Sequence, residues 1–417
     1  MNILIIGSGG REHCLAWKLA QDPAVRVHAT PGNPGMRRLG HIHAAPDPVR
    51  VAQAEAIDLT VVGPEAPLVE GIVDRFRQAG LRIVGPTAAA AQLEGSKIFA
   101  KELMDDVEVP TARFQAFDAL APARRALSRF EYPLVIKADG LAAGKGVFIV
   151  RSRAEADTIL ERMFSGELAG EAGKRVILED FCPGEEVSLI ALSDGEAYVT
   201  LPPAQDHKPV FDGDRGPNTG GMGAYSDDRL LSRDQLRFIQ SSVLQPVIRA
   251  MAQRGTPFQG FLYAGLMITP TGPRVLEFNV RLGDPEAQAI LYRLDTNLAE
   301  LLDAAAAGRL ADVPLRWRPE PAVCVVLAAQ NYPAAPRRGD PIEGIEAAES
   351  MGVTVFHAGT AEENGSLVTH SGRVLGVTAS GESLPAAIRR AYDAVSRIHF
   401  PGMHYRRDIG AKGLKRW

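Results

Sequence analysis

The residue pair best suited to chemistry in this chain is an acid and an amide two positions apart, Glu277 and Asn279. Residues 274–281 are predicted to form a β-strand, in which side chains two apart share a face and stand about 7 Å apart. Carboxylate and amide oxygens are hard ligands that suit Mg²⁺. The spacing therefore predicts a magnesium site, although the wet face of an ordinary antiparallel strand would show the same pattern.

The neighbouring residues predict how this pair is held. Residues 262–273 have the pattern of a partner strand followed by a turn. Strict alternation places Val275 and Arg281 on the same face as the acid–amide pair. After the strand, Asp284 can cap a helix whose first position is Pro285.

A glycine-rich loop lies between two apolar strands in the sequence IKADGLAAGKGV at 136–147. Lys137 ends the first strand. Gly140, Gly144 and Gly146 allow the loop to close its backbone amides over phosphate oxygens. It is not a Walker loop, because Gly146 stands where that motif requires Ser or Thr. A flexible hairpin is the alternative, but it would need fewer glycines, so the pattern favours a phosphate site.

The first 95 residues alternate strands and helices, which predicts a parallel α/β unit with ligand loops at the carboxyl ends of its strands. Gly10, Asn33 and Glu65 all fall on such ends. Glycines before the first helix suit an anion at the helix N-terminus. A dinucleotide fingerprint is weakly supported, because Glu12 stands where Gly or Ala is required. A phosphate site fits better, and a plain tight turn is the alternative.

Two further segments carry charged residues. A helix is expected to begin near Lys97 and carries Lys101 one turn later, where lysines are usually solvated. A strand pair is expected over 176–192, and it carries Glu179 and Glu186, which could equally be surface carboxylates. Neither segment indicates a site without other features of the chain.

The polar, glycine-rich segment 203–226 is long, which indicates either a functional loop or disorder. Phe211 and Tyr225 favour an ordered binding loop. It contains Asp206 and His207. His207 suggests a general base, although a lone loop histidine is more often structural or solvated. The last hundred residues read as a small α+β domain without a catalytic constellation, so packing against the core is its expected role.

The composition is typical of a globular protein with several domains. Its residues are 46% hydrophobic and 23% charged. At 417 residues, the chain is too long to form a single hydrophobic core. A net charge of −4 gives no broad basic field for nucleic acid. Three distant cysteines indicate neither a disulfide framework nor a zinc site, so a reducing cytoplasm is expected. No apolar run reaches the roughly 20 residues of a membrane span.

Together these features suit a nucleotide held between two antiparallel sheets with a metal ion on its phosphates. The chain resembles ATP-grasp ligases, and specifically the phosphoribosylamine–glycine ligases of purine biosynthesis. The motifs occur in family order: GGREH at 9–13, PGNPG at 31–35, VGPEAPLVEG at 62–71, QLEGSK at 92–97, IKADGLAAGKGV at 136–147, QDHK at 205–208, GPNTGGMGAYS at 216–226, EFNVRLGDPE at 277–286, HAGT at 357–360 and GRVLGVTA at 372–379.

The resemblance implies a ligase in which ATP phosphorylates the glycine carboxylate and the amine of 5-phosphoribosylamine attacks the glycyl phosphate. The products are glycinamide ribonucleotide, ADP and phosphate. It implies that Glu277 and Asn279 hold Mg²⁺, for which Mn²⁺ is a possible substitute. The other implied roles are nucleotide binding by Lys97, Lys137, Gly144, Gly146, Glu179, Asp180, Phe181 and Glu186, substrate binding by Gly10, Asn33, Glu65, Asn218, Gly220 and Gly221, and catalysis by Asp206, Arg281 and Asp284.

The fold implied by the resemblance is an α/β ATP-grasp architecture. It divides into an N-terminal parallel, Rossmann-like domain at 1–98, a central ATP-grasp domain at 99–118 and 191–315, a lid at 119–190 and a C-terminal α+β domain at 316–417. The expected partners are the small-molecule substrates glycine, 5-phosphoribosylamine and ATP, without nucleic acid or membrane. A cytoplasmic monomer is expected.

Three other functions fit parts of the pattern. One is a different ATP-grasp enzyme, such as a carboxylase or another amide-forming ligase, which product analysis would separate. Another is a nicotinamide-dependent oxidoreductase built on the N-terminal glycine turn, against which Glu12 argues. The third is a non-catalytic nucleotide-binding regulator, which would bind ATP without releasing ADP.

Overall fold

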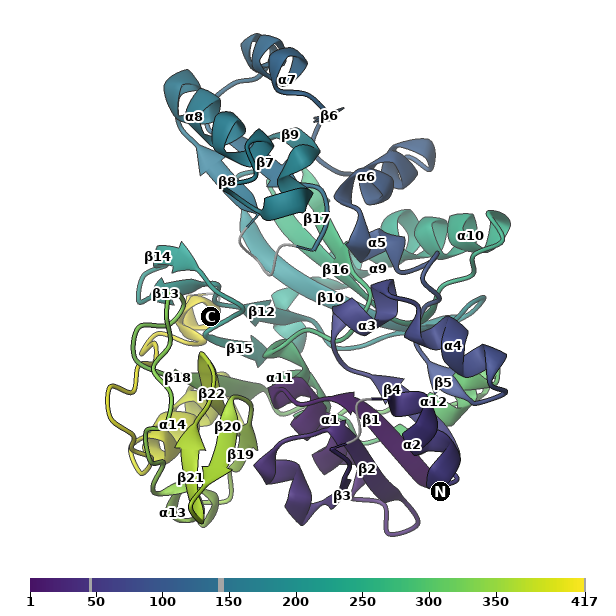
Figure 1. Cartoon of the computed structure of the whole chain (residues 1–417), viewed down its shortest axis with the longest axis vertical. Helices are drawn as coiled ribbons and strands as arrows, with labels where there is room; N and C mark the ends of the chain where they lie inside the picture. The colour runs from purple at the N-terminus through teal and green to yellow at the C-terminus, as the bar shows by residue number, and fades with distance from the viewer. Residues whose placement is uncertain (45–46, 142–145, 416–417) are drawn as a thin grey trace.

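The computed structural model describes residues 1–44, 47–141 and 146–415. Its N-terminal domain is a five-stranded parallel sheet in the order β3-β2-β1-β4-β5 (Figure 1). The elements are β1 (Asn2–Gly7), β2 (Arg26–Pro31), β3 (Gly40–Ile42), β4 (Leu59–Val62) and β5 (Ile83–Val84), with α1 (Gly10–Leu19), α2 (Pro48–Ala54), α3 (Glu65–Val69) and α4 (Ile72–Gln78). The predicted parallel unit is confirmed.

The apolar run of β1 explains why it is the central strand. Leu4 and Ile6 belong to one hydrophobic core, while Ile3 and Ile5 belong to another. A strand buried on both faces needs a continuous apolar sequence, as parallel sheets require. The carboxyl ends of β1, β2 and β4 therefore meet at one edge of the sheet and present their loops together.

The lid is a four-stranded antiparallel sheet in the order β6-β9-β7-β8, at the top of Figure 1. Its elements are β6 (Phe114–Phe117), α7 (Leu120–Ala126), β7 (Leu134–Ala138), β8 (Val147–Val150), α8 (Arg153–Phe164) and β9 (Val176–Asp180). The fully buried residues of its core all come from 123–178. The lid thus has its own hydrophobic core. The helices α5 (Gln92–Gly95) and α6 (Lys97–Asp106) lead into it.

A larger sheet runs through the rest of the molecule in the order β17-β16-β10-β12-β15-β18-β22-β19, with β11 beside β10. Its strands are β10 (Glu185–Asp194), β11 (Tyr198–Thr200), β12 (Ala204–Asp206), β15 (Gly223–Ser226), β16 (Gln259–Thr269), β17 (Gly272–Asn279), β18 (Ala322–Ala328), β19 (Thr354–His357) and β22 (Arg373–Ser380). The last three extend the central sheet across β15, so the C-terminal region is joined to the body by continuous hydrogen bonding.

The remaining elements cover or connect this sheet. They are β13 (Pro209–Phe211), β14 (Arg215–Asn218), α9 (Arg233–Ile239), α10 (Gln245–Gln253), α11 (Glu286–Tyr292), α12 (Leu298–Ala306), α13 (Ile345–Glu349), β20 (Thr360–Glu363), β21 (Ser366–Thr369), α14 (Leu384–Val395) and α15 (Ala411–Leu414). Segment 203–226 is ordered as predicted, and most of it forms short strands. Within the described ranges, no helix combines the length and apolar character needed to cross a bilayer.

Two local predictions were wrong. The expected strand pair over 176–192 does not form, because β9 joins the lid sheet whereas β10 pairs with β16. Val275 was expected beside the acid–amide pair but is fully buried in the core with Phe278. A β-bulge causes the second error: Gly265 pairs with Glu277 and Leu266 with Val275, which leaves Leu276 as an extra residue.

The separate core of the lid predicts that it can be destabilised without disturbing the N-terminal sheet. Leu160 of α8 is fully buried in that core. We expect Leu160→Ala to lower lid stability by about 2–5 kcal/mol through lost burial and an unfilled cavity. Native-state hydrogen exchange should show faster exchange of amides in β7 and α8, and unchanged exchange in β1.

Thr158→Ala is the matched control, because Thr158 lies on the same helix with an exposed side chain. It should change the free energy of opening measured by hydrogen exchange by no more than about 0.5 kcal/mol. Equal acceleration of lid and β1 amides in Leu160→Ala would contradict a separately stabilised lid.

Candidate active site

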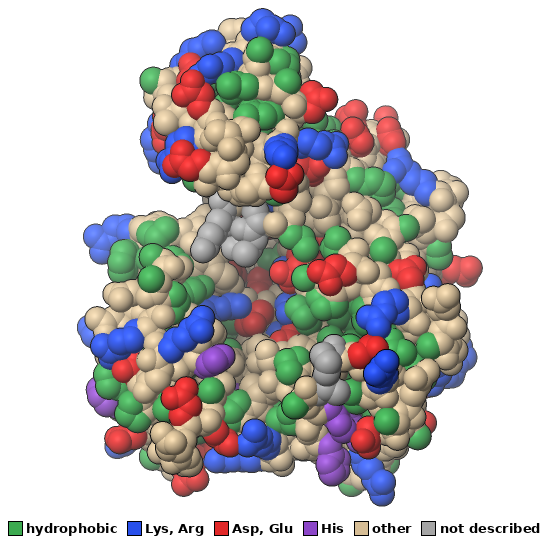
Figure 2. Space-filling model, viewed as in Figure 1, with side chains coloured by type: hydrophobic (Ala, Val, Ile, Leu, Met, Phe, Trp, Pro, Cys, Tyr) green, Lys and Arg blue, Asp and Glu red, His purple; other side chains and the backbone are tan. Residues whose placement is uncertain are grey.

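A cavity of about 560 Å³ lies between the lid sheet and the central sheet. β16 and β17 line it from the body, β7 and β8 from the lid, and α6 from the side. Figure 2 shows the hollow beneath the lid, with acidic and basic side chains inside it. The cavity brings together these predicted site residues: Glu65, Lys97, Lys137, Gly146, Glu179, Asp180, Phe181, Glu186, Asp206, Asn218, Gly220, Glu277, Asn279, Arg281 and Asp284.

Glu277 and Asn279 share one face of β17 and line the cavity, as their spacing predicts. The side chain of Glu277 is 31% exposed, and its Oε1 lies 3.9 Å from Nζ of Lys208. Burial raises the pKa of Glu277, but the charges of Lys208 and its neighbouring lysines outweigh burial and hold the pKa below its ordinary value. An ionised carboxylate beside an amide oxygen on an open face fits a divalent cation.

Positive charge faces this pair from α6 and the lid. Nζ of Lys137 donates to the carbonyl of Leu276 at 2.9 Å, so the bulge residue supplies an acceptor to the lid. Nζ of Lys97 donates to the carbonyl of Gly140 at 3.1 Å. Glu179 forms ion pairs of 2.6 Å with both Lys137 and Lys101. Both lysines predicted to contact phosphates therefore sit at the cavity, across from β17.

The segment that connects lid and body also borders the cavity. The ring of Phe181 is 38% exposed, and Asp180 accepts two hydrogen bonds of 2.9 Å from Arg113. Glu186 at the start of β10 is ion-paired with Lys208. Gly146 lines the cavity at the lid. Gly144, the other glycine predicted to bind nucleotide, lies outside the described residues.

Arg281 is held by acids from the N-terminal region. Its Nη2 donates to Glu94 Oε1 at 3.0 Å and its Nε to Glu65 Oε2 at 3.3 Å. Nη2 also lies 3.3 Å from Oδ1 of Asn279. Burial opposes the charge, but the two carboxylates raise the pKa of Arg281 well above its ordinary value. The guanidinium is therefore a fixed positive charge beside the acid–amide pair.

Asp284 differs from its predicted helix-capping role. Helix α11 begins one residue later than expected, at Glu286, with Pro285 in the capping position. The carboxylate of Asp284 instead faces Arg373, whose Nη2 lies 3.3 Å from Oδ2. Burial raises the pKa of Asp284, but Arg373 and Arg11 hold it below its ordinary value. Asp284 is thus an ionised group that joins α11 to the C-terminal strand β22.

Asp206 lies at the end of β12, near the charged side chains of Glu286 and Lys208. Burial, followed by the charge of Glu286, raises the pKa of Asp206 well above its ordinary value. A side chain at Gly221 would place its Cβ 2.8 Å from Oδ1 of Asp206, and Gly221 has φ of 112°. Gly221 lies outside the set of described residues that line the cavity, and its role here is to allow Asp206 this position.

A second cavity, of about 690 Å³, lies at the carboxyl edge of the N-terminal sheet and shares Asp284 and Arg373 with the first. Asn33 lines it and is buried, with Nδ2 donating to the carbonyls of Ser8 at 2.8 Å and His357 at 2.9 Å. Gly10 follows the lining residue Gly9 and packs closely, because a Cβ added to Gly10 would be 2.6 Å from Nε2 of Gln288.

The glycine turn of β1 contains its own anion. Glu12 Oε2 accepts from the backbone N of Gly9 at 2.5 Å, and its Oε1 accepts from Nε of Arg11 at 2.5 Å. A Cβ at Gly63 would fall 2.0 Å from Glu12 Oε1. The glycines therefore make room for a buried carboxylate, which explains physically why Glu12 replaces the small residue of a dinucleotide fingerprint.

The charged residues of the site that were missed from the sequence include Glu94, Lys101, Lys208, Glu286 and Arg373. Lys101 had a signal, because it follows Lys97 by one turn. Glu94 and Lys208 stand inside the motifs QLEGSK and QDHK. Arg373 overturns the expectation that the C-terminal region only packs, because its Nη1 donates to the carbonyls of Gly220 and Asp284, both at 2.6 Å.

His207 is a structural residue. It is buried, and its Nδ1 lies 3.2 Å from the carbonyl of Gly223. Burial, with the charges of Arg406 and Lys412, lowers the pKa of His207 to about 4. The structural alternative for this histidine fits these contacts better than a general base.

Comparison with known families accounts for most of the chain. Models of phosphoribosylglycinamide synthetase match residues 1–94 as the N domain, 95–287 as the ATP-grasp (A) domain and 322–412 as the C domain. The phosphoribosylamine–glycine ligase of Rhodopirellula baltica is 49% identical, over 99% of this chain and 98% of that protein. The ligase of Pseudomonas aeruginosa is 48% identical, over 100% and 99%.

Solved structures agree with this assignment. The crystal structure of phosphoribosylamine–glycine ligase from Thermotoga maritima has a TM-score of 0.89 and 36% identity, covering 98% of this chain and 100% of that one. The biotin carboxylase domain of Hydrogenobacter thermophilus 2-oxoglutarate carboxylase, at 16% identity and a TM-score of 0.74 over 96% and 91% of the two chains, shares the fold alone. With matching domains from residue 1 to 412 and near-half identity over its full length, the chain belongs to the phosphoribosylamine–glycine ligase family of ATP-grasp enzymes.

Proposed function

We propose that this chain joins glycine to 5-phosphoribosylamine at the expense of ATP, giving glycinamide ribonucleotide, ADP and phosphate. The observation that carries the proposal is the acid–amide pair of β17 facing Lys97 and Lys137 across one cavity. Family membership supports the choice of substrates. A glycine carboxylate oxygen attacks the γ-phosphorus of ATP and ADP leaves; the amine nitrogen then attacks the glycyl carbon, phosphate leaves and the nitrogen loses a proton.

The nucleotide binds between the lid and β17 in this proposal. Glu277 and Asn279 would hold a divalent ion, which neutralises phosphate charge when bound. Lys97 and Lys137 bind phosphate oxygens, while the segment 179–181 and Glu186 border the adenosine end. These residues supply position and charge complementarity, and the reaction needs no protein nucleophile.

Arg281 and Asp206 act at the reacting carboxylate. The fixed charge of Arg281 lies beside Asn279 and suits the negative charge that develops on the acyl phosphate. In its protonated form, which its raised pKa favours, Asp206 can donate a hydrogen bond to a carboxylate. Asn218 and Gly220 border the same space. Water would be excluded by closure of the lid.

The phosphoribosylamine occupies the second cavity. Arg37, Asn33 and the backbone of Gly9 line it. Gly10 follows Gly9 in the chain, whereas Glu65 lines the first cavity. Arg373 and Asp284 line both cavities, so the amine would enter the first cavity beside them. Arg37 and Arg373 at this edge suit a phosphate group.

Further parts of the proposal concern the metal and the state of the protein. We assign Mg²⁺ as the working ion, with Mn²⁺ as a substitute, because both donors are hard oxygens. The chain works as a cytoplasmic monomer divided at 1–98, 99–118 with 191–315, 119–190 and 316–417, except that β6 (114–117) belongs to the lid sheet and β10 (from 185) to the central sheet. Size-exclusion chromatography with light scattering tests the monomer, and activity in Mn²⁺ alone tests the substitution.

The function is tested by measuring ADP release with each substrate omitted in turn. Release should require glycine, and conversion to glycinamide ribonucleotide should require both glycine and 5-phosphoribosylamine. ADP release that depends on bicarbonate, with glycine having no effect, would favour a carboxylase. ATP binding without ADP release under every condition would favour a regulator and sink the ligase proposal.

Replacing the acid of the pair tests the metal site. We expect Glu277→Gln to lower the turnover number at least about 100-fold, because an ionised ligand is replaced by a neutral one. Glu196→Gln, at an exposed carboxylate on the turn after β10, is the control and should turn over normally. Rates close to wild type at limiting Mg²⁺ for Glu277→Gln would refute the assignment.

Removing the lid lysine tests the phosphate contact. A charge-assisted hydrogen bond contributes about 1.5–3 kcal/mol, so Lys137→Ala should raise the ATP concentration for half-maximal rate at least about tenfold. Lys174→Ala removes a lid lysine that is ion-paired with Glu171 at the surface, and it should leave the ATP dependence unchanged. An unchanged ATP dependence in Lys137→Ala would count against the contact.

A further inference from the structure

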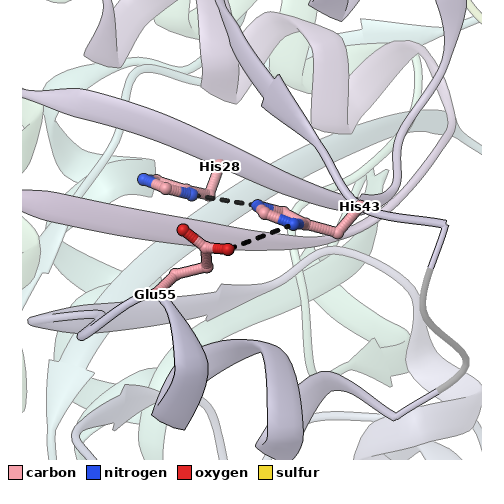
Figure 3. Close-up of side chains that lie close together, drawn as sticks. All are labelled: His28, His43 and Glu55. Atoms are coloured by element: carbon pink, nitrogen blue, oxygen red, sulfur yellow. Dashed lines mark hydrogen bonds and ion pairs between the residues drawn. The ribbon is translucent and has the colours of Figure 1, made fainter.

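Two histidines and a glutamate meet in the N-terminal domain, apart from both cavities. One ligand atom each from His28, His43 and Glu55 lies within 4.8 Å of the others (Figure 3). Nδ1 of His28 is 3.0 Å from Nε2 of His43, and Nδ1 of His43 is 3.9 Å from Oε1 of Glu55. None of the three is among the described residues that line the cavities, so the proposed ligase reaction leaves this cluster unexplained.

The fold itself brings these side chains together. β2 and β3 pair in parallel with His28 opposite His41. The ladder continues beyond β3, because the backbone N of His43 donates to the carbonyl of Ala29 at 2.8 Å. Since side chains two apart share a face, His43 stands on the same side of the sheet as His28. The sequence His41-Ile42-His43 on an edge strand therefore faces a histidine on the neighbouring strand.

Glu55 reaches the pair from a different element. It follows α2, and its backbone carbonyl accepts a hydrogen bond of 3.3 Å from Nδ2 of Asn2 on β1. The side chain of Glu55 is 44% exposed and that of His43 is 18% exposed, whereas His28 is buried. Strand, edge and helix end thus bring three donor residues together, with Nε2 of His43 facing His28 and Nδ1 of His43 facing Glu55.

Two ring nitrogens 3.0 Å apart must share a single proton, because one donates and the other accepts. A tetrahedral ion with metal–nitrogen bonds of about 2.0–2.1 Å holds two nitrogens about 3.3 Å apart. Replacing that proton by an ion requires the rings to turn until both nitrogen lone pairs point at the ion, and the side chain of Glu55 to turn toward the same nitrogen of His43. Imidazole with a carboxylate selects Zn²⁺ and similar ions over Mg²⁺.

We propose that His28, His43 and Glu55 bind a divalent transition-metal ion of the Zn²⁺ class, with water at the remaining position. The ion links β2, the end of β3 and the end of α2, and so clips the edge of the N-terminal sheet to the helix that covers it. This site is distinct from the one proposed at Glu277, because its donors are two imidazoles and a carboxylate, whereas the donors at Glu277 and Asn279 are oxygens alone.

The test is Zn²⁺ binding by the full chain, without an affinity tag, in excess Mg²⁺ so that hard oxygen sites are saturated. Equilibrium dialysis with metal analysis should give one Zn²⁺ per chain. His43→Gln and Glu55→Gln should each weaken binding at least about tenfold, since even indirect partners of a metal change affinity by about 10–100-fold. His399→Gln, which removes an exposed histidine elsewhere, should bind as wild type does.

A second measurement separates this site from the nucleotide cavity. Glu277→Gln should retain the Zn²⁺ stoichiometry and affinity of wild type, and Zn²⁺ should raise the thermal midpoint of wild type but not of Glu55→Gln. Unchanged Zn²⁺ binding in both His43→Gln and Glu55→Gln, or loss of binding in Glu277→Gln alone, would overturn the proposal. Because Glu55 is largely at the surface, its variant keeps the test valid if His43→Gln misfolds.

Discussion

One buried carboxylate holds the nucleotide side of the site together. Glu179 on β9 forms ion pairs with Lys137 on β7 and Lys101 on α6, and all three side chains are almost fully buried. Buried ions are costly unless they are paired. Two lysines against one acid leave a positive charge unmatched. Burial, with the charge of Lys137, lowers the pKa of Lys101 to about 8. The surplus charge adjoins the cavity, where a polyphosphate would neutralise it.

The reacting end depends on residues far apart in the chain. Arg281 follows β17, but its charge is balanced by Glu65 and Glu94 from the N-terminal region. Asp284 is paired with Arg373, which β22 adds to the same continuous sheet. Arg281 and Asp284 therefore each have a partner from another domain, so their arrangement depends on how the domains pack together.

Local patterns predicted much of this arrangement. The parallel N-terminal unit, the strands around Glu277 and Asn279, and the lysine before the glycine loop follow from periodicity and turn residues that act within a few positions. Val275 was misplaced because alternation assumes a regular strand, and only pairing with β16 reveals the bulge. Arg373 was missed because nothing near it in the sequence indicates a site, and its partner Asp284 lies 89 residues away. Those partners are set by tertiary packing.

The contacts between lid and body in this structure suggest how binding and closure are coupled. The lid has its own hydrophobic core, and polar groups at the cavity tie it to the body: Lys137 to the carbonyl of Leu276, and Lys97 to the carbonyl of Gly140. These are the same lysines proposed to bind phosphates. A phosphate oxygen would thus replace a carbonyl as acceptor, giving a stronger hydrogen bond because the donor and the acceptor are then both charged. Because the lid core takes no part in that exchange, the lid can change position without unfolding.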